Sequence, residues 1–185
     1  TKRFKYGDVE LRDWFREKAL SASNPATAEQ TINAAKASNN KYEASIGKMF
    51  LYRYDPKHKA TPKYYDQFPL IFPIEHYDDR WLGINMHYLP PLYRARLMDM
   101  LYETISNQRY DGRAKLQINY KILNAVSKYR YFKPTIHRYL RSHVRSSLVQ
   151  IDIKEWDYAL MLPLAQFKKA NMRTVWDDSI DMITG

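Results

Sequence analysis

The sequence predicts an α+β protein: a small antiparallel β-module, for which a partly open barrel is one possible form, flanked by helices and preceded by an extended N-terminal arm. Nearly all strand-like patterns fall within residues 48–91, and amphipathic helical patterns lie on both sides. A chain of 185 residues can bury one core. We therefore expect an N-terminal helix and linker arm at 1–46 and a single α+β domain at 47–185, with its helical part at 92–185.

The N-terminal arm has two sections. Residues 8–20 place their apolar side chains near one stripe behind a plausible N-cap, Asp8, which predicts a short amphipathic helix. Residues 21–45 are rich in Ala, Ser, Asn and Thr, with Ile32 and Tyr42 as the main large apolar residues. This section buries too little surface to fold alone, so we expect a linker or extended arm with one short helical stretch at most.

The β-module contains three strand-like runs, at 49–54, 69–77 and 80–89. They are rich in aromatic and β-branched residues, and turn-forming pairs such as Asp-Pro and Asp-Asp separate them. The third run alternates between two faces and is predicted to be a half-buried strand. Pro90 and Pro91 end the module, because proline cannot donate to a strand ladder and suits the first turn of a helix.

The segments after the β-module are predicted to be mostly helical. Apolar residues recur at helical spacing in four of them, at 90–107, 119–129, 136–146 and 154–170. The second helix follows residues that fit either a strand or the start of the same helix, and Pro163 should kink or split the fourth. Residues 147–153 are predicted to form a strand. The acidic C-terminal tail carries one anchor-like aromatic residue, Trp176.

Positive charge is concentrated in one segment. The chain has a formal net charge of +10, and residues 109–145 hold ten Lys and Arg against a single Asp. The sixteen tyrosines often neighbour arginine or lysine, a pairing that interfaces favour. This distribution predicts a polyanionic partner for residues 109–145.

The candidate binding residues come from this basic segment. Lysine and arginine neutralise phosphates, while aromatic rings stack on bases or seal protein contacts. The mixture therefore suits nucleic acid or a protein interface, and a solvated basic helix face with its tyrosines in the core is the simpler alternative. The candidates are Arg109, Arg113, Lys115, Lys121, Lys128, Tyr129, Arg130, Tyr131, Phe132, Lys133, Arg138, Tyr139, Arg141 and Arg145.

The sequence offers little support for an enzyme. It has no cysteine, which excludes disulfides and thiolate metal sites, and its five glycines form no phosphate-binding motif. The five histidines lack metal-binding spacing, so we expect no cofactor and no metal. A metal-dependent nuclease using Asp66 with Asp78 and Asp79 remains an alternative, although adjacent carboxylates in a turn are usually only solvated.

Several blocks of the sequence form a distinctive pattern: Met49 to Tyr54 with Asp55-Pro56-Lys57, Tyr64-Tyr65-Asp66, Phe68-Pro69-Leu70, Leu82 to Pro90 with Arg94, Tyr139 to Arg145, Glu155-Trp156, Ala159 and Leu162-Pro163. These blocks resemble virion proteins of large contractile-tailed bacteriophages, of the DNA end-protector type. The resemblance covers about residues 45–176, and the Thr61-Pro62-Lys63 stretch departs from the Leu-Pro expected there.

The resemblance implies a non-enzymatic structural protein, made in the host cytoplasm and assembled into the virion with other virion proteins. It implies binding of DNA ends or of neighbouring subunits through the basic, tyrosine-rich surface, and it brings no catalytic residues. The alternative is a tail, head-tail neck or baseplate joint without nucleic-acid contact. No apolar run approaches the roughly 18–20 residues that span a bilayer, so no membrane partner is expected.

Overall fold

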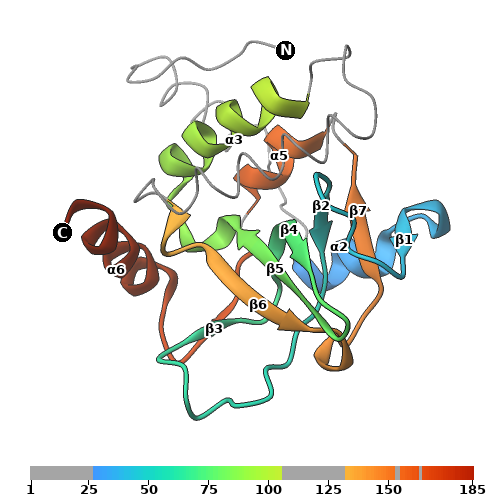
Figure 1. The fold of residues 1–185 in the computed structure, drawn as a ribbon, viewed down its shortest axis with the longest axis horizontal. Helices are drawn as coiled ribbons and strands as arrows, with labels where there is room; N and C mark the ends of the chain where they lie inside the picture. Colours follow the sequence, from blue (N-terminus) through green and yellow to red (C-terminus); the bar gives the residue numbers. More distant parts are fainter. Residues whose placement is uncertain (1–26, 106–131, 153–154, 163) are drawn as a thin grey trace.

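The computed structural model describes residues 27–105, 132–152, 155–162 and 164–185 (Figure 1). In chain order its elements are α2 (Ala28–Ala34), η1 (Ala37–Asn39), β1 (Asn40–Lys41), β2 (Met49–Leu51), β3 (Tyr65–Asp66), β4 (Leu70–His76), β5 (Arg80–Asn85), η2 (Met86–Tyr88), α3 (Pro91–Ile105), β6 (Ile136–Leu140), η4 (Arg141–His143), β7 (Leu148–Ile151), α5 (Trp156–Met161), β8 (Phe167–Lys168) and α6 (Met172–Thr184). None of the helices within these ranges is long and apolar enough to cross a membrane.

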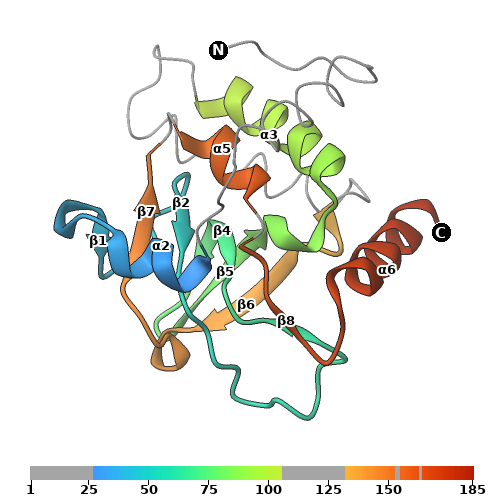
Figure 2. The same cartoon turned by 180° about the vertical axis from the view of Figure 1, so that it is seen from behind.

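A six-stranded sheet organises these elements. Its strands follow the order β1-β7-β2-β4-β5-β6, and every neighbouring pair is antiparallel. The sheet stays open and does not close into a barrel, while β3 and β8 form a separate two-stranded ribbon. Helices α3 and α5 lie next to each other along one side of the sheet (Figures 1 and 2). The predicted α+β class with an antiparallel β-module is confirmed.

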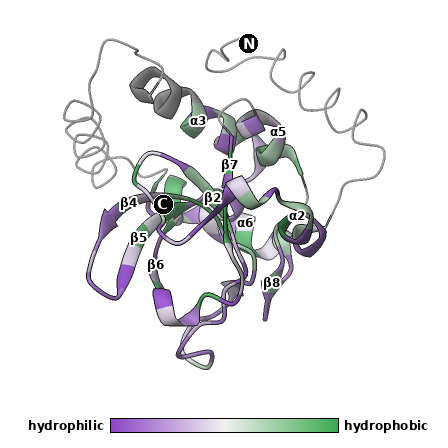
Figure 3. Ribbon diagram, turned by 90° about the vertical axis from the view of Figure 1, so that its right-hand side faces the viewer, coloured by the Kyte–Doolittle hydropathy of each residue, from purple (hydrophilic) through white to green (hydrophobic). Residues whose placement is uncertain are grey.

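The β4–β5 hairpin forms where the sequence predicts it. The backbone N–H of Tyr77 donates to the carbonyl of Arg80 at 2.8 Å, which places Asp78 and Asp79 at the turn. The register shifts once within the hairpin, next to Pro73, which has no N–H to give to the ladder. The tip of the hairpin is hydrophilic in Figure 3.

Both faces of the central strands are buried. Along β5, Leu82 and Ile84 belong to the larger core on the α3 and α5 side, while Trp81 belongs to a second core on the opposite face. The larger core joins the sheet to α5 through Phe72 and Trp156, whose ring centroids lie 5.0 Å apart. The predicted alternation is therefore correct along β5, but the strand ends at Asn85 because Met86–Tyr88 form η2. The assignment of the run as a half-buried strand is wrong.

Residues 136–146, for which the apolar spacing predicts a helix, form strand β6 and the short helix η4 instead. Ile136 to Leu140 pair with Ile84 to Arg80 along the edge of β5. The helical spacing of the apolar residues in this segment is real, but backbone pairing with a distant strand outweighs so short a local pattern. The strand predicted at 147–153 is confirmed by β7 at Leu148–Ile151.

Part of the predicted linker packs on the sheet. Helix α2 starts with a capping box, in which the side chains of Thr27 and Gln30 each accept a hydrogen bond from the other residue's backbone N–H. Its first residue, Ala28, is buried in the larger core. Strand β1 then pairs with β7. These contacts use small residues and backbone groups, so the low apolar content of this stretch conceals them.

The remaining helix predictions are correct in part. The helix predicted at 90–107 is present as α3, whereas the one predicted at 154–170 is limited to Trp156–Met161. Leu162 is extended, as expected for a residue before proline. The acidic tail forms helix α6, capped by the Asn171 side chain. The helices predicted at 8–20 and 119–129 lie outside the described residues.

Replacing Phe72 with alanine should strongly destabilise the fold. Phe72 is 2% exposed and packs edge-to-face against Trp156. The substitution removes this ring packing and leaves a cavity, so we expect the free energy of unfolding to fall by about 3–5 kcal/mol. Urea denaturation measures the decrease. Tyr158→Ala is the matched control, because Tyr158 is 46% exposed and its removal should change stability by no more than about 0.5 kcal/mol. Equal effects of the two variants would contradict the assigned core.

Candidate nucleic-acid interface

The structure describes six of the fourteen candidate binding residues. Four of them are exposed cationic side chains, Lys133, Arg138, Arg141 and Arg145, and two are aromatic residues, Phe132 and Tyr139. The other eight lie outside the described residues, namely Arg109, Arg113, Lys115, Lys121, Lys128, Tyr129, Arg130 and Tyr131.

The two aromatic candidates lie in the protein interior. Phe132 is 1% exposed and Tyr139 is 4% exposed. Tyr139 pairs with Trp81 across the β5–β6 ladder, and its ring meets those of Tyr52 and Tyr54 edge-to-face at 5.8 and 5.0 Å. Since both side chains are buried, neither Phe132 nor Tyr139 has a face free to stack on a base.

The exposed arginines are held by backbone pairing. After β6 the chain passes the second core and meets the segment that follows β2. The N–H of Asp55 donates to the carbonyl of His143 at 3.0 Å, and the N–H of Arg145 donates to the carbonyl of Arg53 at 2.8 Å. We call residues 141–147 the crossover segment. It has a defined course although it contains little regular secondary structure.

The crossover segment presents positive charge with little neutralisation. Residues 133–147 contain no Asp or Glu. Arg145 lies 4.0 Å from the Asp55 carboxylate, which Lys59 approaches more closely at 2.7 Å. These exposed pairs are weak, since water and salt screen them. Arg53 is also exposed beside the segment, so this surface carries more positive than negative charge.

An open groove of about 720 Å³ lies between β1 and the crossover segment. Its lining includes Lys41, Tyr42, Arg141, Ser147 and the buried Trp81. The guanidinium of Arg141 donates to the carbonyl of Tyr42 at 2.9 Å and lies 5.8 Å from the centre of the Trp81 ring. Sequence reasoning did not select Lys41 and Tyr42, because they lie in the predicted linker, far along the chain from the basic segment.

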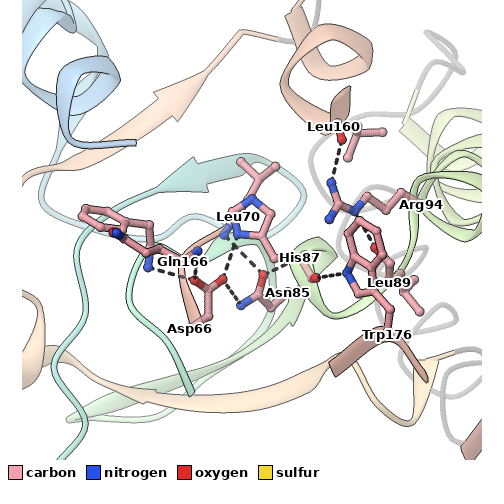
Figure 4. A network of polar contacts seen from close by, with 10 residues as sticks. Asp66, Leu70, Asn85, His87, Leu89, Arg94, Leu160, Gln166 and Trp176 are labelled. Atoms are coloured by element: carbon pink, nitrogen blue, oxygen red, sulfur yellow. Dashed lines mark hydrogen bonds and ion pairs between the residues drawn. The ribbon is translucent and has the colours of Figure 1, made fainter. Parts of the chain in front are cut away.

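A second polar constellation is buried elsewhere in the molecule (Figure 4). The Asp66 carboxylate accepts hydrogen bonds from the N–H of Phe68 at 3.0 Å and from the Asn85 amide at 3.0 Å. His87 Nδ1 lies 2.8 Å from the same carboxylate, and the N–H of Gln166 lies 3.4 Å from it. Three separate parts of the chain therefore meet at one charged group, at residues 66–68, 85–87 and 166.

The protonation states in this network follow from burial and partners. Burial would raise the pKa of Asp66, but its hydrogen bonds with His87, Asn85 and Phe68 hold it below the ordinary value. Burial lowers the pKa of His87, despite the neighbouring carboxylate. Since a carboxylate only accepts, Nδ1 of His87 carries the proton, and Nε2 has no hydrogen-bond partner among the described residues. The neutral imidazole suits this site best.

Arg94 and Trp176 extend the network to helices α5 and α6. Arg94 is buried, and it donates to the carbonyls of Leu89 at 2.6 Å and Leu160 at 2.7 Å. Burial lowers its pKa to about 10, so it stays charged. Trp176 packs its ring against the guanidinium at 5.4 Å and donates to the carbonyl of His87 at 3.0 Å. The prediction that Trp176 anchors the tail agrees with these contacts.

The acidic residues considered for a nuclease do not share a site. Asp66 bonds to Asn85, the last residue of β5, whereas Asp78 and Asp79 precede its first residue. A six-residue strand spans roughly 17–20 Å, so the carboxylates lie at opposite ends of β5. Within the described ranges, no group of three or more His, Asp or Glu side chains is arranged to hold a metal ion.

The buried network coincides with blocks on which the family resemblance rests. Asp66, Asn85, His87 and Arg94 are all among the residues quoted for it. The signal that could have revealed them is the presence of polar residues within apolar runs, because a buried polar group must find partners. These residues join segments of the fold and have no exposed reacting group.

The buried histidine should make the protein less stable in mild acid. Because folding lowers the pKa of His87 below 6.5, the unfolded chain takes up a proton first as the pH falls below that value. The free energy of unfolding should therefore decrease between pH 7 and pH 5. His137 contributes with the same sign, since burial lowers its pKa as well. Asp66 adds a further decrease below pH 3.8.

Urea titrations at several pH values measure this dependence. His87→Asn keeps a donor near the Nδ1 position but cannot titrate, so its stability at pH 7 should be lower and its slope between pH 7 and pH 5 shallower. An unchanged slope in the variant would exclude His87 as the source of the acid sensitivity.

The comparisons with known proteins identify one family. A family model described as "Phage T4 terminal DNA protecting protein" matches residues 10–179. Searches of curated proteins and of solved structures gave no match. The family match extends over most of the chain and contains both the exposed basic surface and the buried network. The chain therefore belongs to the family of phage T4 terminal DNA protecting proteins.

Proposed function

We propose that this protein binds the ends of linear DNA and protects them by occupying them, without catalysis of its own. The family supplies the end-protecting role. The surface around the crossover segment supplies the chemistry, because Arg141 and Arg145 are exposed on a stretch that contains no acidic residue and Arg53 is exposed beside it. Arginine suits phosphate contacts, since its planar guanidinium offers several donors at once.

Protection by occupancy needs a stable surface and no reacting group. The backbone bonds at His143 and Arg145 fix the course of the crossover segment. The second core, which lies beside the crossover segment, is closely packed, with Trp81 Nε1 donating to the Tyr52 hydroxyl at 3.2 Å. A surface that keeps its shape gives up little conformational entropy when DNA binds.

The setting of this activity is the virion, where the protein works with other virion proteins. A tail, neck or baseplate joint would bury the same arginines against neighbouring subunits. The two functions differ in one measurable respect, because only the first requires the isolated protein to bind DNA.

Replacing the three arginines with glutamine should weaken DNA binding. We expect Arg53→Gln/Arg141→Gln/Arg145→Gln to lower the affinity for a linear duplex at least about tenfold in moderate salt. The dependence of affinity on salt should also become shallower, by about one unit of log–log slope for each phosphate that the variant no longer neutralises. Fluorescence anisotropy over a salt series measures both quantities.

The matched control removes three positive charges from another part of the surface. Lys63→Gln/Lys168→Gln/Arg173→Gln changes exposed residues near β3, β8 and α6 and has the same net charge as the test variant. It should bind DNA much more like the wild type. An equal decrease in both variants would show that only net charge matters, and no binding by the wild type at low salt would overturn the proposed function.

An exonuclease assay tests the protective step. Saturating protein should slow the digestion of linear duplex by an exonuclease that starts at ends, and the arginine variant should protect less at the same concentration. The protein alone with magnesium should leave the DNA intact. Cleavage by the purified protein would overturn the non-enzymatic assignment.

A further inference from the structure

One aromatic ring stands out on the basic surface. Tyr42 is 94% exposed, whereas the aromatic residues of the second core are buried. It follows the edge strand β1 and lines the groove against the crossover segment. An open ring face is the chemical requirement for stacking on a base.

The backbone beneath this ring is fixed. Arg141 donates to the carbonyl of Tyr42, and Arg141 itself lies over the Trp81 ring in the groove. Residues 40 and 41, immediately before Tyr42, pair with Val149 and Leu148 of β7. The backbone that carries the Tyr42 ring is therefore held by strand β7 on one side and by the crossover segment on the other.

Cationic groups lie within the same groove. Lys41 is exposed next to Tyr42, and Arg141 is exposed across the groove. Among the described residues Arg141 uses one of its donors, on the Tyr42 carbonyl, and a guanidinium has five. An aromatic ring flanked by two cations matches a terminal nucleotide, which presents an unstacked base face and phosphates close to it.

We propose that this groove is the site that recognises the DNA end itself, with the terminal base stacked on Tyr42 and the terminal phosphates held by Lys41 and Arg141. This inference rests on the proposed function. It adds the reason why the protein would prefer an end to internal duplex: the bases of internal duplex are stacked on each other and offer Tyr42 no free face, so internal sites provide only the phosphate contacts.

Comparing open and closed ends tests the proposal. The full-length protein is titrated with a blunt-ended duplex and with a duplex of equal length whose two ends are closed by hairpin loops. The wild type should bind the open-ended duplex more tightly. Tyr42→Ala should bind the open-ended duplex roughly tenfold more weakly, as expected for removal of one stacked base, and the closed duplex almost as the wild type does.

Two further variants separate stacking from other effects. Tyr42→Trp keeps an aromatic face and should retain the preference for open ends. Tyr158→Ala removes an exposed tyrosine from α5 and should bind both duplexes as the wild type does. Because Tyr42 is almost fully exposed, the urea midpoint of unfolding of Tyr42→Ala should equal that of the wild type. An equal midpoint excludes a folding defect as the cause of weaker binding.

The outcomes distinguish this inference from the proposed function. If the wild type prefers open ends and Tyr42→Ala keeps that preference, the groove assignment is wrong while end binding stands. If the wild type binds open and closed duplexes equally, both end binding and the groove assignment are overturned. A loss of preference in Tyr42→Ala that Tyr42→Trp does not share supports the stacking site.

Discussion

The buried carboxylate of Asp66 is the constraint on which much of this fold depends. It receives donors from the residues just after its own strand, from the end of β5, from η2 and from the segment before β8. A charge in the interior is tolerable only when such donors surround it, so the β3 segment, the β5–η2 segment and the segment before β8 must reach their native positions together. The arrangement favours one unique packing over other compact states, and Arg94 with Trp176 carries the same requirement to α5 and α6.

The two faces of the sheet carry different cores. One face carries the larger core, with α3 and α5 above it. The other face carries the second core, and the crossover segment covers this core and forms backbone hydrogen bonds with residues 53–55. The tyrosine of β6 packs in the core, and the arginine next to it is exposed although the segment is a strand and not the predicted helix. Stability and charge presentation thus arise from adjacent residues of the same strand, as Arg138 and Tyr139 show.

The accuracy of the sequence predictions followed the range of the interactions involved. The β4–β5 hairpin depends on neighbours in the chain, so its turn at Asp78 and Asp79 could be located. The β6 segment depends on β5, about fifty residues earlier, and its apolar spacing suggested a helix. The candidate binding residues divided in the same way: charge could be located from composition, but the burial of Phe132 and Tyr139 could not, because it depends on which distant side chains cover them.

The sequence by itself determined the absence of cysteine chemistry, the excess of positive charge in residues 109–145 and the blocks that resemble phage end-protector proteins. These are properties of residue types and their local order. Only the tertiary structure decided that Tyr139 is a core residue while Tyr42 is open to solvent, that Asp66 is a structural charge, and that Lys41 lies across a groove from Arg141. Burial and proximity are set by pairing between strands such as β1 and β7, which lie about one hundred residues apart, and no local pattern encodes that pairing.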